Sequence, residues 1–280
     1  MTRVNENLDA ATVEGFGEEW ARFEQSNLSQ SELQQYFEWY FSEFPWASLR
    51  RDAVGFDLGC GSGRWARFVA PRVGKLHCID ASRKALQVAR KNLAGLPNCE
   101  FHEASVGAMP IEDGTMDFGY SLGVLHHVPD TAEAIRACAR KLKPGAPLLL
   151  YLYYRFDNRP AWFRVLWGVS DVGRRGISKL PHQARQVVTD AVATTVYLPL
   201  AMAARAAEKL GLNVDHFPLA GYRRASFYTM RTDALDRFGT RLEQRFTRSE
   251  IAEMMRSAGF EGIRFREGSP YWCAVGFRSA

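Results

Sequence analysis

Residues 52–65 have the sequence DAVGFDLGCGSGRW, which predicts a short apolar strand, a glycine-rich turn and the first turn of a helix. Gly59, Gly61 and Gly63 let the backbone approach a ligand closely, because glycine has no Cβ atom and tolerates positive φ. The N–H groups at the start of the following helix favour a carboxylate or a phosphate. The spacing is G-x-G-x-G, led by Asp57, instead of the G-x-G-x-x-G of dinucleotide-binding loops. This stretch therefore predicts a ligand-binding loop, but the class of ligand has to be inferred from motifs elsewhere in the chain.

The composition is that of an ordinary soluble globular protein. The 280 residues, 46% hydrophobic and 24% charged, suffice for one large α/β domain with an elaboration or for two small domains. The cysteines are odd in number, form no C-x-x-C pair and have no metal-ligand spacing relative to the histidines. We therefore expect reduced thiols in the core of a cytoplasmic protein, and no metal site. The cysteines are Cys60, Cys78, Cys99, Cys138 and Cys273.

We expect neither a signal peptide nor a membrane span. Residues 1–6 lack the apolar run of a signal peptide. The longest apolar run, residues 192–204, contains Pro199 and is shorter than the ~20 residues that a span needs. We interpret this run as a buried helix or a lid helix.

The positive charge is concentrated in one segment. The chain has a net charge of +5, and residues 155–240 hold 13 Lys and Arg against 7 Asp and Glu. A basic segment favours a mildly acidic substrate or surface. A solvated basic face is an equally good interpretation, so the charge alone does not choose between them.

Residues 1–50 are expected to form an N-terminal helical segment. Residues 1–15 are polar, and we expect them to be mobile. Trp20 and Phe23 share one face of a first helix, and aromatic residues recur at helical spacing in residues 31–44. This aromatic surface predicts packing against the domain that follows, although Trp20 could instead cover a cofactor or a substrate.

Four further strands are expected after the first, at 75–80, 99–104, 116–122 and 147–152. Helices are expected between them at 64–70, 83–94 and 131–142. Asp80 is the last residue of the second strand. A carboxylate at this point of a doubly wound fold can accept both ribose hydroxyls of an adenosine.

Four short motifs follow one another in a characteristic order. They are DLGCGSG at 57–63, the strand-end acid at 80, VLHHVPD at 124–130 and LKPG at 142–145. This arrangement resembles the class I S-adenosylmethionine (SAM)-dependent methyltransferases, and within them the type 11 subgroup. The resemblance spans residues 53–152 and resumes at 246–277.

The resemblance implies an α/β fold with a doubly wound, seven-stranded Rossmann-like methyltransferase sheet whose last strand is antiparallel. A helical cap would be inserted after the fifth strand. The implied domains are an N-terminal helical segment at 1–50, a SAM-binding core at 51–154 and 241–280, and an inserted cap or substrate region at 155–240.

The resemblance also implies SAM as the cofactor and S-adenosylhomocysteine as the product. Asp57 and the glycine loop suit the amino-acid end of SAM, Asp80 suits the ribose, and Ser105 with Val106 suits the adenine. The family pattern F-x-x-G-D-A-x-x-L-P has D-A where this chain has Ser105 and Val106, so Ser105 keeps a hydrogen bond but loses a charge-assisted one. The predicted cofactor-binding residues are Asp57, Gly59, Cys60, Gly61, Gly63, Asp80, Ala81, Ser105, Val106 and Leu122.

His126 and His127 are the candidate catalytic residues, because they follow the fourth strand at the same sheet edge as the glycine loop. A histidine with a near-neutral pKa can take a proton from a nucleophile. Adjacent residues point in different directions, so we expect only one of them to reach the substrate. Each could equally be a structural histidine hydrogen-bonded to a loop. In some relatives an acid after the fifth strand assists, but here that position holds Leu152.

The insertion at 155–240 leaves the fifth strand at the edge where ligands of open α/β sheets bind, so we interpret it as a helical cap over the substrate. Arg223 and Arg224 could clamp a carboxylate or phosphate of the acceptor, or could face solvent. Tyrosines such as Tyr222 are more often packing residues than catalytic ones. The predicted substrate-binding residues are Trp20, Tyr153, Tyr222, Arg223 and Arg224.

We expect a SAM-dependent methyltransferase that acts on oxygen or nitrogen of a small-molecule or glycan acceptor, with an acidic acceptor as one option. An RNA or protein methyltransferase is the alternative. The sequence has no N-P-P-Y-type motif, no appended RNA-binding module and only modest positive charge, so we expect no nucleic-acid partner.

Two further functions are more distant. The Asp80 contact would fit NAD as well as SAM, but the glycine spacing speaks against a NAD-linked oxidoreductase. Nothing in the sequence requires the other function, a protein that binds the cofactor without catalysing a reaction. The identity of the acceptor and the oligomeric state stay open.

Overall fold

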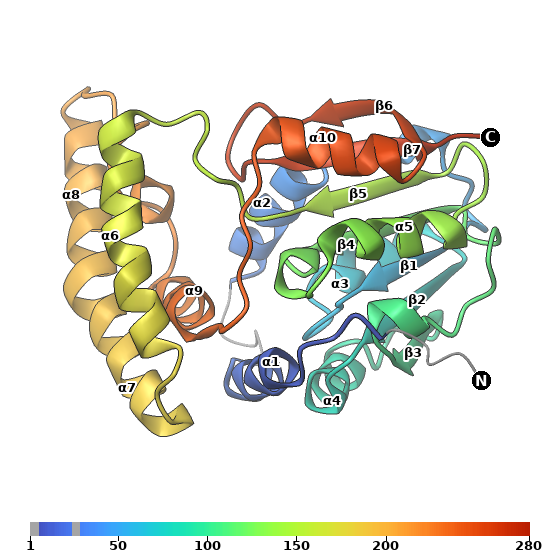
Figure 1. The fold of residues 1–280 in the computed structure, drawn as a ribbon, viewed down its shortest axis with the longest axis horizontal. Coiled ribbons are helices and arrows are strands. Elements are labelled where there is room, and N and C mark those ends of the chain that lie inside the picture. Colours follow the sequence, from blue (N-terminus) through green and yellow to red (C-terminus); the bar gives the residue numbers. More distant parts are fainter. Residues whose placement is uncertain (1–5, 24–28) are drawn as a thin grey trace. The chain divides into compact units, whose positions relative to one another are not determined.

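The computed structural model describes residues 6–23 and 29–280, which divide into two compact units. Of the described residues, unit 1 contains 6–23, 33–155 and 242–280, and unit 2 contains 29–32 and 156–241. The sheet and the helices that cover it belong to unit 1, whereas unit 2 is helical (Figure 1).

Unit 1 is built on a seven-stranded sheet with the strand order β3-β2-β1-β4-β5-β7-β6. Neighbouring strands from β3 to β5 are parallel, and β7 is antiparallel to both β5 and β6. This topology confirms the doubly wound methyltransferase sheet and its antiparallel last strand. The strands are β1 (Val54–Leu58), β2 (Lys75–Asp80), β3 (Cys99–Glu103), β4 (Phe118–Leu122), β5 (Pro147–Tyr151), β6 (Phe260–Phe265) and β7 (Cys273–Arg278).

The central strands are buried on both faces, as expected for a parallel sheet between two layers of helices. Two glycines make room for two fully buried aromatic rings on neighbouring strands. A Cβ atom at Gly119 would lie 2.2 Å from the Phe56 ring, and one at Gly55 would lie 2.4 Å from the Phe118 ring. The register places each glycine directly opposite its phenylalanine, so the pairing of β1 with β4 depends on both.

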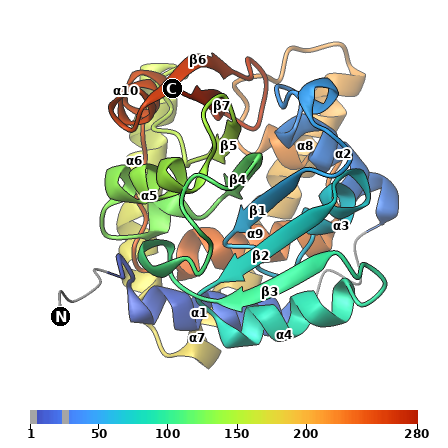
Figure 2. The ribbon, with the colours of Figure 1, turned by 90° about the vertical axis from the view of Figure 1, so that its right-hand side faces the viewer.

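Helices cover both faces of the sheet, and each face has its own hydrophobic core (Figure 2). Helices α5 and α10 pack on one face, and α2, α3 and α4 pack on the other. The N-caps of α4, α5 and α10 are Ser82, Asp130 and Thr247, side chains that accept an N–H group of the first turn. These helices are α2 (Gln30–Tyr40), α3 (Ala66–Val69), α4 (Arg83–Asn92), α5 (Thr131–Lys141) and α10 (Arg248–Ser257).

The first helix, α1 (Ala10–Arg22), packs against α4. Its N-cap is Asp9, whose carboxylate accepts a first-turn N–H at 2.8 Å. Gly17 permits the close approach, since a Cβ atom there would lie 2.4 Å from Ser82 Oγ. The expectation of a mobile segment at 1–15 is therefore wrong for 10–15, where capping and packing outweigh the polar composition. Residues 1–5 lie outside the described part of the chain.

Unit 2 has a small core of its own, formed by Ala193, Tyr197 and Ala201 together with Met230 and Ala234. Its helices are α6 (Ala161–Ile177), α7 (His182–Val192), α8 (Leu198–Lys209) and α9 (Phe227–Gly239), and residues 193–197 form a π-helical turn between α7 and α8.

Helices α7 and α8 form one continuous helix, His182–Lys209, through the π-helical turn. Among the described residues, this helix is long and apolar enough to cross a membrane, judged by length and composition alone. The expectation that the apolar run at 192–204 is too short for a span therefore does not hold for the whole helix. The shorter estimate came from Pro199, but the π-helical turn just before it lets the helix continue through the proline. One such helix is weak evidence for a span, because core helices of soluble proteins pass the same test.

A partly buried ion-pair network holds part of unit 2 together. Asp171 accepts hydrogen bonds from Arg174 Nε at 2.6 Å and from Arg175 Nε at 2.9 Å. Arg174 also donates to the carbonyl oxygen of Thr240 at 3.0 Å, which links α6 to the end of α9. Burial opposes ionisation of Asp171, but the two arginines outweigh burial and lower the pKa of this carboxyl below its usual value.

Candidate functional site

The glycine loop, defined here as residues 59–63, leaves the carboxyl end of β1. Gly59, Gly61 and Gly63 have φ angles of +76°, +54° and +77°, a region that other residues rarely adopt. The N–H groups of Gly59 and Cys60 both donate to the carbonyl oxygen of Ile79, at 2.7 and 3.1 Å, and so tie the loop to the end of β2. A Cβ atom at Gly59 would lie 2.3 Å from the Val124 side chain, so the loop also contacts the segment that follows β4.

Asp80 ends β2 and faces the glycine loop, as the sequence predicts. Its Oδ2 accepts the N–H of Gly61 at 2.9 Å, and its Oδ1 accepts the N–H of Ser82 at 2.8 Å. Burial raises the pKa of Asp80 above its usual value, and the two N–H groups oppose that shift. A carboxylate has about four lone-pair positions, so about two remain for the hydroxyls of a ribose.

Asp57 is buried and is held by a tyrosine that the sequence analysis missed. The Tyr120 hydroxyl donates to Asp57 Oδ2 at 3.0 Å. Burial raises the pKa of Asp57 to about 8, although the hydrogen bond from Tyr120 opposes the shift. Tyr120 and Asp57 are register partners on β4 and β1, so correct strand pairing would have brought them together.

The predicted cofactor-binding residues outside β1 and the glycine loop lie at the carboxyl ends of β2, β3 and β4. Ser105 and Val106 follow β3 and are buried, and Ser105 Oγ has no hydrogen-bond partner among the described residues. A buried hydroxyl without a partner is costly, so a ligand amine would stabilise this position. Ala81 directly follows Asp80, and Leu122 is the buried last residue of β4.

His126 and His127 lie in the 3₁₀ turn 125–127 that follows β4, and both are buried. His126 Nδ1 accepts the N–H of Tyr153 at 3.4 Å, and its ring stacks on the Tyr153 ring with centroids 3.9 Å apart. His127 Nδ1 lies 2.6 Å from the carbonyl oxygen of Leu242. Since a carbonyl oxygen can only accept, His127 carries a proton on Nδ1.

The two rings therefore use Nδ1 in opposite ways. His126 accepts at Nδ1 and has its proton on Nε2, whereas His127 donates at Nδ1, so that its Nε2 carries the lone pair whenever the ring is neutral. Burial holds the pKa of His126 well below its usual value, and the charges of His127 and Arg245 lower it further. His126 is therefore neutral at pH 7.

Residues 242–246 support this histidine turn, a role that no sequence pattern indicates. The N–H of Gln244 donates to the His126 carbonyl oxygen at 3.0 Å, and Gln244 Nε2 donates to the Val128 carbonyl oxygen at 2.7 Å. These contacts join segments more than 100 residues apart, which no local pattern can reveal.

Trp20 lies against the glycine loop. A Cβ atom at Gly61 would lie 2.9 Å from the indole ring, and the Arg64 guanidinium lies 5.5 Å from the centroid of the same ring. The indole thus covers part of the loop, while its contact with a ligand stays a prediction.

The other predicted substrate residues, apart from Tyr153, belong to unit 2. Arg223 Nε donates to Glu208 Oε1 at 2.9 Å, and Arg224 donates to Glu208 Oε2 at 3.1 Å. The ring of Tyr222 lies 5.2 Å from that of Tyr197, between centroids. Both arginines thus share one carboxylate within their own unit, and their contact with a substrate stays a prediction.

The five cysteines are free, and all but the half-buried Cys99 are buried. Cys60 lies in the glycine loop, with the Cys78 thiol next to it. The hydrogen bond with Cys78 lowers the pKa of Cys60, but burial and the carboxyls of Asp80 and Asp57 outweigh it and raise the pKa to about 11. Cys60 is therefore a protonated thiol at neutral pH.

Two observations in unit 1 fit an adenosine cofactor. Asp80 retains acceptor capacity, and Ser105 Oγ lacks a partner among the described residues. Both lie at the carboxyl ends of parallel strands, where open α/β sheets bind their ligands.

Known proteins resemble the chain over this region. A family model described as a methyltransferase domain matches residues 56–150. The ubiquinone biosynthesis O-methyltransferase of Ralstonia nicotianae is 31% identical over 178 residues, which cover 61% of this chain and 72% of the relative. The chain belongs to the type 11 class I SAM-dependent methyltransferases.

Two further matches add detail. The ubiquinone biosynthesis O-methyltransferase of Paracidovorax citrulli is 35% identical over 108 residues, which cover 38% of this chain but only 44% of the relative. A candidate methyltransferase of Haloferax volcanii, solved with the methyltransferase activator Trm112, has a TM-score of 0.52 and 14% identity over 96% of this chain and 98% of that chain. At this identity the likeness shows the fold alone.

Membership of this family assigns SAM as the cofactor. It also decides against a NAD-linked oxidoreductase, in agreement with the G-x-G-x-G spacing. The acceptor is left open.

Proposed function

We propose that the chain transfers the methyl group of SAM to a hydroxyl oxygen of a small molecule in the cytoplasm, with His127 as the proton acceptor. The observation that carries the proposal is the hydrogen bond from His127 Nδ1 to the Leu242 carbonyl oxygen, at 2.6 Å. The names of the two O-methyltransferase relatives support oxygen as the target atom and a small molecule as the acceptor.

The cofactor-binding residues would act by position. SAM supplies, when bound, an electrophilic methyl group on a sulfonium. Asp80 would hold the ribose hydroxyls, Ser105 Oγ would accept or donate at the adenine edge, and the glycine loop would let the backbone approach. Orientation and exclusion of water are the main contributions that a protein makes to such an in-line transfer.

His127 is suited to remove the proton from the acceptor hydroxyl. Its Nε2 carries the lone pair, and the bond from Nδ1–H to the Leu242 carbonyl holds the ring and favours the imidazolium once it forms. Val124, three residues earlier, contacts the glycine loop, so the histidine turn and the loop are neighbours.

His126 supports the same step in a different way. Its low pKa keeps it neutral beside His127, so the imidazolium that forms meets no second positive charge in the next ring. Its Nε2–H can donate to an oxygen that is losing its proton, whereas in this tautomer Nε2 cannot accept one.

The test is a comparison of His127→Ala with His126→Asn in an assay with isotopically labelled SAM and a panel of hydroxylated and amine-bearing small molecules. We expect kcat to fall about 100-fold or more in His127→Ala, the scale of a lost general base, with SAM affinity unchanged. We expect a smaller fall in His126→Asn, and no change in the control His216→Ala, whose side chain is exposed.

An unchanged kcat for His127→Ala across the pH range would overturn the role of His127. Label found only on nitrogen would overturn oxygen as the target. Label found only on RNA or protein from a host extract would favour the alternative function.

A further inference from the structure

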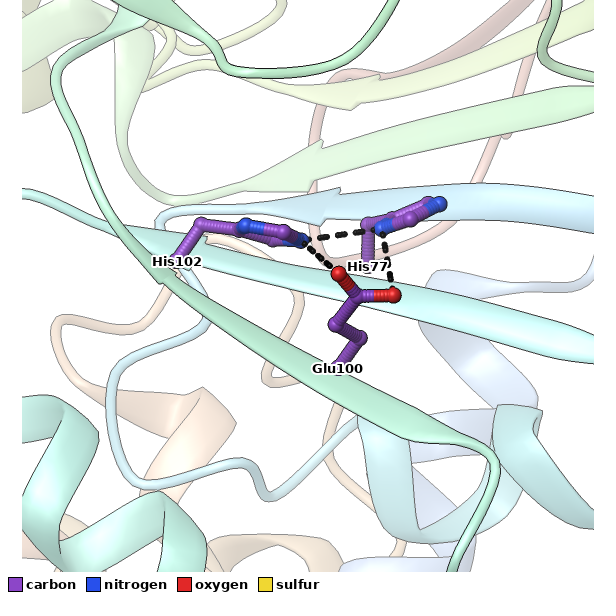
Figure 3. Close-up of side chains that lie close together, drawn as sticks. All are labelled: His77, Glu100 and His102. Atoms are coloured by element: carbon purple, nitrogen blue, oxygen red, sulfur yellow. Dashed lines mark hydrogen bonds and ion pairs between the residues drawn. The ribbon is translucent and has the colours of Figure 1, made fainter.

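Two histidines and a glutamate point toward one another at the β2–β3 edge of the sheet (Figure 3). His77 lies on β2, and Glu100 and His102 lie on β3. His77 is the register partner of Glu100, and His102 is two residues further along β3, on the same face. His77 precedes Asp80 by three residues, so this cluster is separate from the SAM-binding residues at the strand ends.

The spacing of the three ligand atoms suits a single small cation. His77 Nδ1 lies 2.9 Å from His102 Nε2 and 3.8 Å from Glu100 Oε2, and His102 Nε2 lies 3.6 Å from Glu100 Oε1. Four ligands at about 2.0–2.1 Å around tetrahedral Zn²⁺ lie about 3.3 Å from one another. With one ligand atom taken from each residue, all three lie within 4.8 Å of one another, so the separations must change by up to about 1.5 Å to complete the site.

The protonation state of the histidines also suits a metal. Burial lowers the pKa of both His77 and His102 below the usual value, against the attraction of Glu100. Both rings are therefore neutral at pH 7, the form that binds metal ions. His102 is only partly buried and Glu100 is exposed, so an ion and a water molecule can reach the cluster from solvent.

One neighbour opposes cation binding. Lys75 Nζ lies 2.7 Å from Glu100 Oε2, and its positive charge would repel a bound ion. The same salt bridge engages Oε2 and leaves Oε1, the oxygen nearer to His102 Nε2, for coordination. A site with this neighbour should bind, but less tightly than the same three ligands without it.

We propose that His77, Glu100 and His102 bind one Zn²⁺ ion, with water in the fourth position. Two imidazoles and one carboxylate form a ligand set typical of zinc with an open position, whereas Mg²⁺ and Ca²⁺ prefer oxygen ligands. The ion joins the edge strand β3 to β2, and it stabilises the folded chain because the unfolded chain does not hold the three ligands together.

The experiment is a calorimetric titration of the untagged, chelator-treated full chain with ZnCl2, repeated with Co²⁺ to record the absorption spectrum. We expect one equivalent of Zn²⁺ to bind and the melting temperature to rise. We expect the Co²⁺ spectrum to be that of a four-coordinate nitrogen–oxygen site without thiolate bands. Affinity should fall about 100-fold or more in His102→Ala, beyond the loss usual for outer-shell partners.

Lys75→Gln supplies a test of opposite sign, because removal of its positive charge should tighten Zn²⁺ binding several-fold. Cys99→Ser and His216→Ala are controls that should bind like the wild type, since Cys99 faces the other side of β3 and His216 lies in unit 2. If His77→Ala does not fold, His102→Ala and Glu100→Gln still decide, because both side chains are less buried.

The proposal is overturned if the wild type shows no saturable Zn²⁺ binding. It is also overturned if binding persists unchanged in His102→Ala or disappears in Cys99→Ser. In those cases the cluster is a hydrogen-bonded network of two histidines with the Lys75–Glu100 salt bridge.

Discussion

Asp80 joins the glycine loop to the start of α4 through two backbone N–H groups, and its remaining lone pairs could accept the ribose hydroxyls predicted there. Asp80→Asn replaces one carboxylate oxygen by an NH2 group and removes the charge. Hydrogen bonds to charged groups contribute about 1.5–3 kcal/mol, so we expect SAM affinity to fall about 10- to 100-fold. Calorimetric titration with SAM measures the change.

Glu103→Gln is the matched control for this substitution. Glu103 is the register partner of Asp80 at the end of β3, and its side chain is exposed. We expect its SAM affinity to equal that of the wild type. Equal losses in both variants would mean that Asp80 acts through the net charge of the sheet edge and not through a specific contact.

His126 makes the stability of the chain depend on pH. Its folded-state pKa lies well below the usual value, so the unfolded chain takes up a proton near pH 6.5 and the folded chain does not. The contribution of the neutral ring is complete above pH 6.5 and is lost as the pH falls below it, by at most about 1.4 kcal/mol per pH unit. Urea unfolding at several pH values should show that the unfolding free energy falls less steeply below pH 6.5 in His126→Asn than in the wild type. An identical pH dependence in both would contradict the buried, neutral state of His126.

At the residue scale, a sequence motif predicts where a residue lies in the fold better than it predicts which residues that side chain contacts. The sequence placed Gly59 and Asp80 at adjacent strand ends because each belongs to a short local pattern. It could not assign the tautomer of His127, since the deciding carbonyl is 115 residues away. It also did not bring His77, Glu100 and His102 together, because residues on two strands have no recognisable sequence spacing.

The glycine loop is the element whose shape depends most on its residue types. In Gly59→Ala the new methyl would meet Val124 at a positive φ, so both strain and overlap destabilise the chain. We expect a loss of about 2–5 kcal/mol in unfolding free energy, the sum of about 1–2 for the left-handed conformation and about 1–3 for overpacking. Denaturant unfolding measures this loss.

Gly114→Ala separates the two contributions. Gly114 also has a positive φ, of +67°, but a Cβ atom there would have no neighbour within 4 Å. We therefore expect only the conformational part, about 1–2 kcal/mol. If the two variants lost equal stability, the contact between the glycine loop and Val124 would have no energetic weight.

Helices and strands were predictable where the hydrophobic pattern agreed with the residues that cap or end an element. The second strand was predicted at 75–80 and is found there, because an apolar run ends in an acid and a serine cap. The pattern failed for 10–15, where the helix depends on contact with α4. It also failed at Pro199, because a π-helical turn lets the helix continue through the proline.

The whole molecule contains separate hydrophobic cores in its two units, and all predicted SAM-binding residues lie in unit 1. Asp171→Ala would leave the buried Arg174 without its carboxylate partner, a change that typically costs about 3–5 kcal/mol. We expect faster hydrogen–deuterium exchange in residues 156–241 and unchanged SAM affinity. Mass spectrometry of peptic fragments localises the exchange.

Asp215→Ala is the control, since Asp215 is an exposed carboxylate in the same unit. We expect its exchange pattern to match the wild type. A loss of SAM affinity in Asp171→Ala, with faster exchange in residues 54–80, would show that the stability of unit 1 depends on unit 2.

At the scale of the whole molecule, the seven-stranded sheet was predicted from the family resemblance. The residue patterns of the individual strands do not show which strands are neighbours. The break after the fifth strand was visible as a change in composition near residue 155, and the structure divides the chain between Arg155 and Phe156. The role of residues 155–240 as a cap stays a prediction, because composition and helical periodicity carry no information on what a helix covers.

The thiol of Cys60 gives the chain a native reporter of movement in the cofactor loop. Alkylating reagents attack the thiolate, and a buried thiol whose pKa is about 11 is protected from them while the loop keeps its shape. Iodoacetamide should therefore modify Cys60 only as often as the loop opens. A ligand that fastens the loop would slow the labelling of Cys60 and leave that of Cys99 unchanged.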